Sequence, residues 1–387
     1  MPGPWHKDRI GTASHSQEFR SLMDLGTASV KALIVELGGT QTHIWGHGRA
    51  PLEGGYGPDG TIVDREAVAA ACDAALSAAE GMTIETLGHN IVPDQSVWSV
   101  PGWLCHRHTF AFQRRRSWPK RRISRREWLA MQARLDRTVA GLSGTPVDVI
   151  PTVRVDGSTV TDVIDLRGEK LALEVFVTSA DSDALATFQK VATTLELDPP
   201  TFVSEARAAA AGLPNDGVLL DVGRWGTNIT VARLGQPADA AWIPFGGQSF
   251  YRTLINGFGL TPARLPGFCQ AYAEGWLPPE TTTAVGAALV DPVARWLDLV
   301  AGQLAGLATE TSLPHQIYLA GGASRLPAVP QGSRRYAWMR QLSWPRHPEV
   351  HLWQAASVSH LANHTGYIWD ASDLVRLGLA RLAVNIE

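Results

Sequence analysis

Two aspartates that stand just before glycine turns are the residues whose type and spacing best suit chemistry in this sequence. Asp24 ends one short apolar run and precedes Gly26, and Asp221 ends another and precedes Gly223. Glycine lets backbone N–H groups approach an anion closely, and a carboxylate can hold a metal ion through water. Two such turns that face each other across a cleft would bind a nucleoside triphosphate and its metal ion.

A third apolar run, residues 317–320, ends at Gly321-Gly322-Ala323. Short apolar runs that stop at glycine are typical of buried strands that lead into tight turns. Helical patterns separate these runs. We expect helices over 62–79, 124–139, 183–195, 201–213, 250–258, 290–309 and 372–383, and strands within 218–234 and over 241–245. Strands that alternate with helices indicate an α/β protein with two lobes.

The segment from Trp98 to Ala180 has a different character, and it predicts a small inserted α+β unit. Asp156-Gly157 lies between β-branched runs, which is a hairpin signal. Ser124 and Glu127 have the spacing of a capping box in front of a helix.

Length and composition indicate a globular chain of two or three domains or subdomains, because 387 residues are 45% hydrophobic and 18% charged. Three widely spaced cysteines argue against a disulfide scaffold and fit a reducing cytoplasm. Residues 1–20 are polar without the apolar core of a signal peptide, so we expect a loose tail there. No stretch approaches the roughly 20 apolar residues of a membrane span.

Basic residues are concentrated in one window of a chain whose formal net charge is −3. From Arg107 to Arg126 there are nine Lys/Arg and no Asp/Glu. Such a patch suggests a partner surface, and anionic lipid, nucleic acid or an acidic peptide would each fit, as would a solvated loop without a partner. We expect contact with an anionic membrane surface through Arg107–Arg126, and no nucleic acid.

The order of the three turns resembles the actin-like ATPase superfamily, which includes actin, the sugar kinases and the heat-shock chaperone ATPases. This resemblance implies the two-lobed ribonuclease-H-like α/β fold, with ATP and Mg²⁺ as ligands. It implies that Asp24 and Asp221 hold the metal ion. The implied nucleotide-binding residues are Gly26, Thr27 and Lys31 in the first turn, Gly223, Arg224 and Thr227 in the second, and Gly321, Gly322 and Ala323 around adenosine.

The insertion places the chain near one branch of the superfamily. Residues 147–175 look like subdomain 1C of the bacterial cell-division protein FtsA, and residues 201–206 resemble the next helix of that family. There Glu205 is expected to orient the attacking water, so the implied catalytic residues are Glu205, Asp24 and Asp221. The pilus assembly protein PilM is a close relative, and residues 24–31 suit it equally well.

The resemblance also divides the chain into subdomains. The expected parts are a tail over 1–20, subdomain 1A over 21–97, 181–213 and 357–387, subdomain 1C over 98–180, subdomain 2A over 214–250 and 317–356, and subdomain 2B over 251–316.

The second turn departs from the family pattern, because Arg224-Trp225 stands where backbone should approach phosphate. Arg224 could contact a phosphate bidentately. Alternatively, Arg224 and Trp225 could form a cation–π pair that closes a vestigial site. We therefore expect a nucleotide-binding protein with weak or absent ATPase activity.

Two functions follow as hypotheses from this branch. The first is an FtsA-like, filament-forming scaffold that lies at the inner face of the cytoplasmic membrane in cell division, assembles head to tail and links partners such as the tubulin-like FtsZ to the membrane. The alternative is a PilM-like scaffold of type IV pilus assembly, in which a groove beside the insertion binds a peptide from an inner-membrane protein. A small-molecule kinase would need a catalytic Asp that we do not find, and nucleic-acid binding would rest on charge alone.

Overall fold

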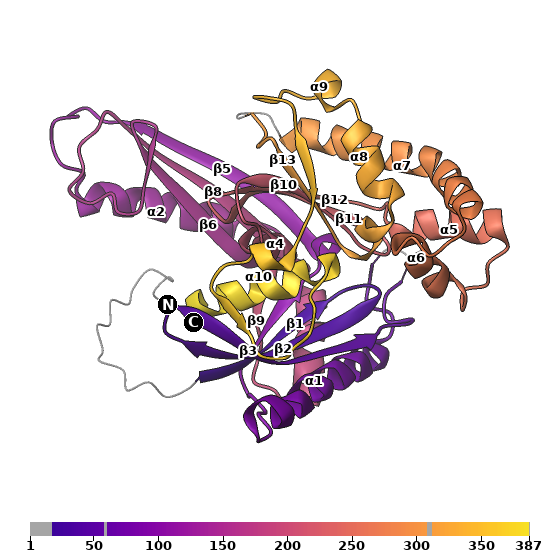
Figure 1. Ribbon diagram of the computed structural model, residues 1–387. Coiled ribbons are helices and arrows are strands. Elements are labelled where there is room, and N and C mark those ends of the chain that lie inside the picture. Colours follow the sequence, from indigo (N-terminus) through magenta and orange to yellow (C-terminus); the bar gives the residue numbers. More distant parts are fainter. Residues whose placement is uncertain (1–17, 58–59, 308–311, 387) are drawn as a thin grey trace.

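Three β-sheets organise the computed structural model, which describes residues 18–57, 60–307 and 312–386 (Figure 1). Lobe 1 contains a six-stranded sheet in the order β15-β3-β2-β1-β4-β9. Lobe 2 contains a five-stranded sheet in the order β12-β11-β10-β13-β14, and the insertion contains a four-stranded sheet in the order β5-β8-β6-β7. The expected α/β architecture with two lobes and an inserted unit is confirmed.

The strands of lobe 1 come from three separate parts of the chain. They are β1 (Glu18–Leu25), β2 (Ser29–Gly38), β3 (Gln41–Pro51), β4 (Ser96–Val100), β9 (Thr201–Ser204) and β15 (Leu361–Asn363). β1 and β2 form an antiparallel hairpin in which Asp24 lies opposite Lys31, whereas β4 lies parallel to both β1 and β9. The carboxyl ends of three parallel strands therefore meet at one edge of the sheet.

Helix α1 (Arg65–Leu87) covers one face of this sheet (Figure 1). The side chain of Asp64 caps its first turn by accepting a hydrogen bond from the backbone of Ala67. Gly46 and Gly48 of β3 allow close approach, because a Cβ on either would lie within 2.0 Å of a backbone oxygen of α1. Among the described helices, α1 alone is long and apolar enough to cross a membrane, but its apolar face is part of the lobe 1 core.

The insertion begins later than the sequence suggests. Trp98 lies within β4 of lobe 1, and the inserted sheet starts only at Cys105. Its elements are β5 (Cys105–Arg115), α2 (Arg125–Ala140), β6 (Thr145–Val155), β7 (Ser158–Val160) and β8 (Lys170–Ala180). The capping box of Ser124 and Glu127 is confirmed, and so is the hairpin turn at Asp156-Gly157, where both residues have positive φ angles.

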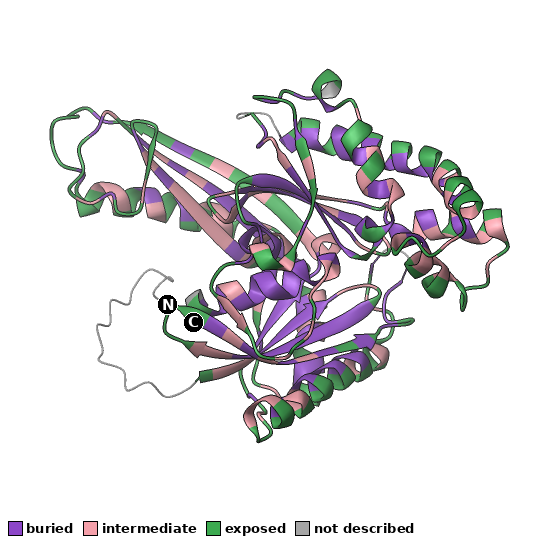
Figure 2. Ribbon diagram, in the orientation of Figure 1, coloured by how far each residue is buried: buried purple, intermediate pink, exposed green. Residues whose placement is uncertain are grey.

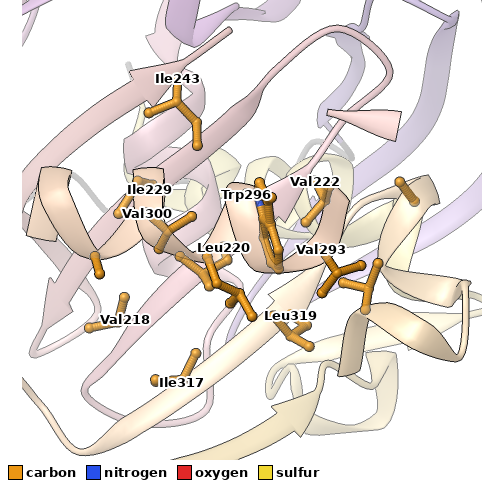
Figure 3. Close-up of a cluster of buried hydrophobic side chains, with 14 of the residues drawn as sticks. Val218, Leu220, Val222, Ile229, Ile243, Val293, Trp296, Val300, Ile317 and Leu319 are labelled. Carbon is orange, nitrogen blue, oxygen red and sulfur yellow. The ribbon is translucent and has the colours of Figure 1, made fainter. Parts of the chain in front are cut away.

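Lobe 2 packs helices against its sheet around one large hydrophobic cluster (Figure 3). Its strands are β10 (Gly217–Val222), β11 (Thr227–Arg233), β12 (Gln236–Ile243), β13 (Gln316–Ala320) and β14 (Glu349–Leu352). Its helices are α5 (Gly247–Phe258), α6 (Leu265–Ala273), α7 (Pro279–Leu307), α8 (Ala328–Arg335) and α9 (Trp338–Gln341). Trp296 of α7 is fully buried among the strand residues in Figure 3, and its indole N–H donates to Thr227 Oγ1 at 3.0 Å.

Two short helices lie between the lobes and are almost wholly buried (Figure 2). They are α4 (Glu205–Ala211) and α10 (Leu374–Leu382). Ala208 to Ala211 give α4 little bulk, and a Cβ on Gly378 of α10 would lie 1.8 Å from the carbonyl oxygen of Ala208. The two helices are therefore in backbone-to-backbone contact at the junction.

Several expected boundaries differ in the structure. Residues 201–204 form strand β9, and the helix begins only at Glu205 because Ser204 caps it. The helix expected from residue 290 begins at Pro279, and residue 309 lies outside the described residues. Of the expected tail, residues 1–17 lie outside the described residues and 18–20 belong to β1.

Two further helices follow the insertion and the last strand as expected. α3 (Ser182–Thr194) lies close to the span expected over 183–195, and α10 lies within the span expected over 372–383.

Candidate nucleotide cleft between the lobes

The end of the β1–β2 hairpin carries a buried ion pair. Lys31 Nζ donates to Asp24 Oδ2 at 2.8 Å and to the carbonyl oxygen of Ser372 at 2.6 Å. The other carboxylate oxygen of Asp24 accepts from Ser99 Oγ at 3.3 Å. Both charged groups therefore already have partners within the chain. Neither the carboxylate of Asp24 nor the ammonium group of Lys31 faces the cleft as an unpaired charge.

Glu205 joins the two lobes through its carboxyl group. The side chain lies in the first turn of α4, and Oε2 accepts from the backbone N–H of Gly102 at 2.9 Å. Oε1 accepts from Asn228 Nδ2 at 2.7 Å. Gly102 follows β4 of lobe 1, and Asn228 lies in β11 of lobe 2. A Cβ on Gly102 would lie 1.9 Å from Asn228 Oδ1, so the lobes are in contact at this point.

Burial and neighbouring negative charge raise the proton affinity of two carboxyl groups here, those of Glu205 and Asp221. Burial raises the pKa of Glu205 well above its ordinary value, and the nearby charges of Asp221 and Asp24 raise it further. Burial also raises the pKa of Asp221 to about 6, an effect that Lys31 opposes and Asp24 adds to. Glu205, Asp221 and Asp24 therefore lie close enough together to interact electrostatically. A proton or a cation would relieve their repulsion.

The second turn is the tip of the β10–β11 hairpin. The N–H of Gly223 donates to the carbonyl of Gly226 at 2.9 Å, and the carbonyl of Gly223 accepts from the N–H of Gly247 at 2.8 Å. Trp225 extends from this tip to the hydrophobic cluster of lobe 1 that contains Met23 and Leu25. An indole from lobe 2 therefore packs on lobe 1 at the turn expected to bind phosphate.

Two expectations for this turn are wrong. The Thr227 hydroxyl does not face the cleft, because it is fully buried, donates to the carbonyl of Phe245 at 2.7 Å and accepts from Trp296. The cation–π contacts found between described residues involve other arginines, so Arg224 does not pair with Trp225 in this way. Arg224 is exposed, and its Nε lies 3.5 Å from Gln248 Oε1.

The third turn follows β13, which lies parallel to β10. Gly321 has a φ angle of 83°, and a Cβ there would lie 2.3 Å from Asp221 Oδ1. Only glycine therefore lets the carboxyl of Asp221 reach this turn. A Cβ on Gly322 would meet open space, whereas Ala323 is buried against lobe 2. Gly322 is thus the residue of this turn that remains open to a ligand.

The residues present fit Mg²⁺ only through water. Carboxylate oxygens are ligands that Mg²⁺ prefers, and three carboxyl groups converge here. Within the described residues, however, no group of three or more His, Cys, Asp or Glu side chains is arranged to hold a metal ion. Asp24 and Asp221 could therefore contact a hydrated ion rather than ligate a bare one.

The fit to ATP is incomplete. Gly26 and Thr27 are partly exposed, and Gly322 has space beside it, so the first and third turns fit a nucleotide. The second turn does not fit a triphosphate as it stands, because Trp225 occupies the junction and Thr227 is buried. The expectation that Lys31 contacts phosphate is also wrong, because its ammonium group is already bound to Asp24 and Ser372.

The structure brings together the predicted residues Asp24, Lys31, Glu205, Asp221 and Gly321. Three residues that hold them were not predicted from the sequence: Ser99, Gly102 and Asn228. A signal for Gly102 exists, because Pro101-Gly102 ends the apolar run 97–100 as glycine ends the other runs. Ser99 and Asn228 have no comparable signal, since a single polar residue within a strand is common.

No protein-family model and no curated protein matches the chain. Solved structures do match along nearly the whole length. The PilM-PilN type IV pilus biogenesis complex gives a TM-score of 0.62 at 16% identity, covering 94% of this chain and 98% of that one. The ethanolamine utilization protein EutJ from Carboxydothermus hydrogenoformans gives 0.52 at 13% identity, covering 95% and 91%.

The chain has the actin-like two-lobed ATPase fold. Because the identities are below one fifth, the likeness establishes the fold and no more. The expected actin-like architecture with an inserted subdomain between β4 and α3 is confirmed. The first, second and third turns lie at the ends of β1, β10 and β13, at the junction between the lobes that Glu205 links.

Proposed function

We propose that this protein is an actin-like scaffold at the inner face of the cytoplasmic membrane that binds a short peptide of a partner between lobe 1 and the insertion. The observation that carries the proposal is a hollow of about 250 Å³ at this junction. It lies beside the insertion, where the sequence hypothesis of a PilM-like scaffold requires a groove.

The hollow has the chemistry of a peptide site. Leu185 of α3, Phe202 of β9 and Val147 of β6 give it apolar walls. Thr145 and Ser182 share a hydrogen bond of 2.9 Å at its margin. Apolar walls with a few polar groups suit the side chains of a bound peptide.

Backbone groups for such a peptide lie beside the hollow. β9 is an edge strand of the lobe 1 sheet, and within the described part of the chain β7 pairs only with Val153–Val155 of β6. Residues 145–152 of β6 therefore have a neighbouring strand, β8, on one side only. Peptides often bind by adding a strand to such an edge.

The walls of the hollow are held in place by a buried carboxylate. Asp148 of β6 accepts from the backbone N–H of Ser204 at 2.9 Å and from Arg207 at 2.9 Å. The Asp148 side chain is completely shielded from solvent. Because Ser204 and Arg207 belong to lobe 1, this contact fixes the spacing between the insertion and lobe 1. A pre-formed site of this kind loses little conformational entropy when it binds.

The structural similarity to the PilM-PilN type IV pilus biogenesis complex supports this proposal. An FtsA-like filament in cell division remains the alternative hypothesis from the sequence. The fold is common to both. ATP with Mg²⁺ is the proposed ligand of the cleft, and we infer that the cleft serves mainly as a junction between the lobes because Trp225 occupies its second turn.

The test uses two exposed positions of α3. Gln189 lines the hollow and Thr193 lies one turn farther along the same helix, outside the hollow. The probe is a synthetic copy of the cytoplasmic segment of a bitopic membrane protein that co-purifies with the full chain. Gln189→Trp should lower peptide affinity at least about tenfold by filling the hollow. Thr193→Trp is the matched control.

Isothermal titration calorimetry measures both variants against the wild type. Equal affinity for Gln189→Trp and the wild type would exclude the hollow as the peptide site. Loss of affinity in Thr193→Trp as well would show a general effect of added tryptophan on α3. Thermal melts of each variant check that the fold is retained.

A further inference from the structure

The far end of the insertion carries an unusual concentration of positive charge. Residues 114–127 and 156–170 together contain ten Lys/Arg and five Asp/Glu, a balance of +5 in a chain whose net charge is −3. We call these two segments the tip. Figure 1 shows the insertion projecting away from both lobes, with the tip loops at its outer end.

The basic residues of the window 107–126 have three different roles in the structure. Arg107 lies outside the tip and forms an ion pair with Asp239 of lobe 2. Arg116 is buried and structural, with 6% of its surface exposed. The remaining arginines and lysines of the window are exposed on the tip. The exposed basic patch is therefore smaller than the window 107–126, and it lies entirely on the tip.

Arg116 builds the tip by holding its two loops together. Its guanidinium group donates to the carbonyls of Gly168 at 2.8 Å and Arg121 at 3.0 Å, and to the carboxylate of Glu127 at 3.0 Å. Backbone hydrogen bonds join Ile123 to Leu166 in both loops. The surface outside is consequently pre-formed, and its exposed side chains need no folding step to meet a partner.

The exposed charges are mostly unpaired. Arg115 pairs with Glu169 and Arg122 lies 3.7 Å from Asp165. Within the described residues, seven other cations of the tip have no carboxylate within ion-pair distance: Arg114, Lys120, Arg121, Arg125, Arg126, Arg167 and Lys170. One of them, Arg121, packs its guanidinium group over the ring of Trp118, which is 68% exposed.

We propose that the tip of the insertion binds the surface of an anionic lipid bilayer, with Trp118 and Leu166 entering the headgroup region and the surrounding basic side chains contacting lipid phosphates. Tryptophan favours the boundary between water and lipid because its ring is apolar and its N–H is polar. Juxtamembrane basic clusters are attracted by the negative surface potential of the cytoplasmic leaflet. Leu166, which is 37% exposed, adds an apolar side chain to the tip, and buried apolar area strengthens binding to a lipid interface.

The inference deepens the proposed function, because it supplies the membrane contact of a scaffold that acts at the membrane. The tip and the peptide hollow belong to different ends of the insertion. A substitution in the tip leaves the hollow intact, and a substitution in the hollow leaves the tip intact. Each proposal can therefore be refuted without the other.

The test measures sedimentation of the full chain with two kinds of vesicle. One kind is phosphatidylcholine alone, and the other contains roughly 30% phosphatidylglycerol to imitate an anionic leaflet. Arg125→Gln with Arg126→Gln removes two charges from the first turn of α2, where cations are unfavourable to a helix, so the fold is retained. Each removed charge should weaken binding to anionic vesicles roughly fivefold. Arg295→Gln with Arg335→Gln, exposed on lobe 2, is the control of equal charge.

The role of Trp118 is tested in the same way, with an exposed tryptophan of lobe 2 as the control. Trp118→Ser should reduce vesicle binding severalfold, while Trp276→Ser, at a site 69% exposed on lobe 2, should leave it unchanged. Equal binding to neutral and anionic vesicles would overturn the proposal. Equal losses of vesicle binding in the control variants would overturn the proposal as well. Tighter binding to a 20-base-pair DNA duplex, abolished by the same arginine substitutions and without vesicle binding, would make the tip a nucleic-acid surface instead.

Discussion

Lys31 lies within electrostatic reach of three carboxyl groups, those of Asp24, Glu205 and Asp221. One cation cannot neutralise three buried anions, so at least one carboxyl retains its proton near neutral pH. The elevated pKa of Glu205 identifies it as the group that does so. A protonated Glu205 adds no negative charge beside Asp221, so both carboxyl groups can remain buried at the junction between the lobes.

The pH dependence of stability tests this arrangement. The folded state holds a proton on Asp221 up to a pKa of about 6, whereas the unfolded chain loses it near the ordinary aspartate pKa of 3.8. The contribution of Asp221 to stability is therefore greatest below pH 3.8 and is lost as the pH rises toward 6. This loss amounts to roughly 3 kcal/mol.

Asp221→Asn should remove that dependence, because asparagine does not titrate. Chemical denaturation of both proteins at intervals between pH 4 and 7 measures it. Parallel stability curves for the wild type and the variant would contradict the assigned pKa. Addition of Mg²⁺ should flatten the wild-type curve if a hydrated ion enters the cleft, since a cation lowers the pKa of a neighbouring carboxyl.

Trp225→Gly tests whether the cleft retains the capacity to bind a nucleotide. Removal of the indole frees the junction and lets the backbone of the second turn approach phosphate. We expect affinity for ATP–Mg²⁺ to rise at least about tenfold over the wild type, as measured by calorimetry. Trp276→Gly, an exposed site on lobe 2, serves as the control. Unchanged affinity in Trp225→Gly would show that the paired Lys31 and buried Thr227 suffice to exclude the nucleotide.

At the scale of elements, the contact between α4 and α10 depends on glycine. Gly378 has no space for a side chain, because a Cβ would lie 1.8 Å from the carbonyl oxygen of Ala208 and 3.2 Å from the N–H of Gly212. Neither obstacle is the mobile end of a side chain. Any larger residue must therefore push the helices apart, and the lobes that they support would move with them.

Gly378→Ala should lower the free energy of unfolding by about 1–3 kcal/mol, in the range of overpacked cores. Gly302→Ala in α7 is the matched control, since its Cβ would meet open space within another helix. There alanine should stabilise the helix by about 0.5–1 kcal/mol. Urea denaturation of both variants measures the difference. A neutral Gly378→Ala would mean that the helices can separate freely.

How much the sequence predicts varies with the range of the interactions involved. The Asp156-Gly157 hairpin and the Ser124 capping box depend on residues close together in the chain, and both were predicted. The fold was also accessible, through recognisable strand-end turns, but the pairing of Lys31 with Asp24 was not, because Lys31 was expected to face phosphate. The position of Trp225 was not, because its burial depends on lobe 1 residues about 200 positions away.

Local sequence pattern also gives a wrong boundary where a strand leads directly into a helix. The alanine run after Glu205 suggests a helix across 201–213, but residues 201–204 pair with β4 as a strand. Strand pairing is a long-range interaction that overrides helix propensity here. The Thr227 hydroxyl illustrates the same limit, since its partner Trp296 comes from a distant helix.

At the scale of the whole molecule, the lobes are joined by the chain's own side chains rather than by a ligand. Glu205 links Gly102 to Asn228, Trp225 packs on lobe 1, and Arg107 ties the insertion to Asp239 of lobe 2. An actin-like protein whose lobes are already joined has less to gain from ATP as a bridge.

Electron microscopy of pelleted protein on anionic vesicles tests this view. We expect the assembly state of the wild type to be the same with and without ATP–Mg²⁺, because the junction does not require the nucleotide. Trp225→Gly should make assembly dependent on ATP. Wild-type filaments that form only with ATP would contradict this expectation and would favour the FtsA-like hypothesis.

The route of the chain through lobe 1 bears on its synthesis. Strands β1 to β4 are made early, but β15, which pairs with β3, and α10, which packs against α4, come more than 250 residues later. All five strands of lobe 2 precede α10 in the chain. On the ribosome, lobe 2 can therefore complete its core first, while the early strands wait with an open edge for their last partners. The N-terminal half of this protein is consequently the part that most needs protection by chaperones during translation.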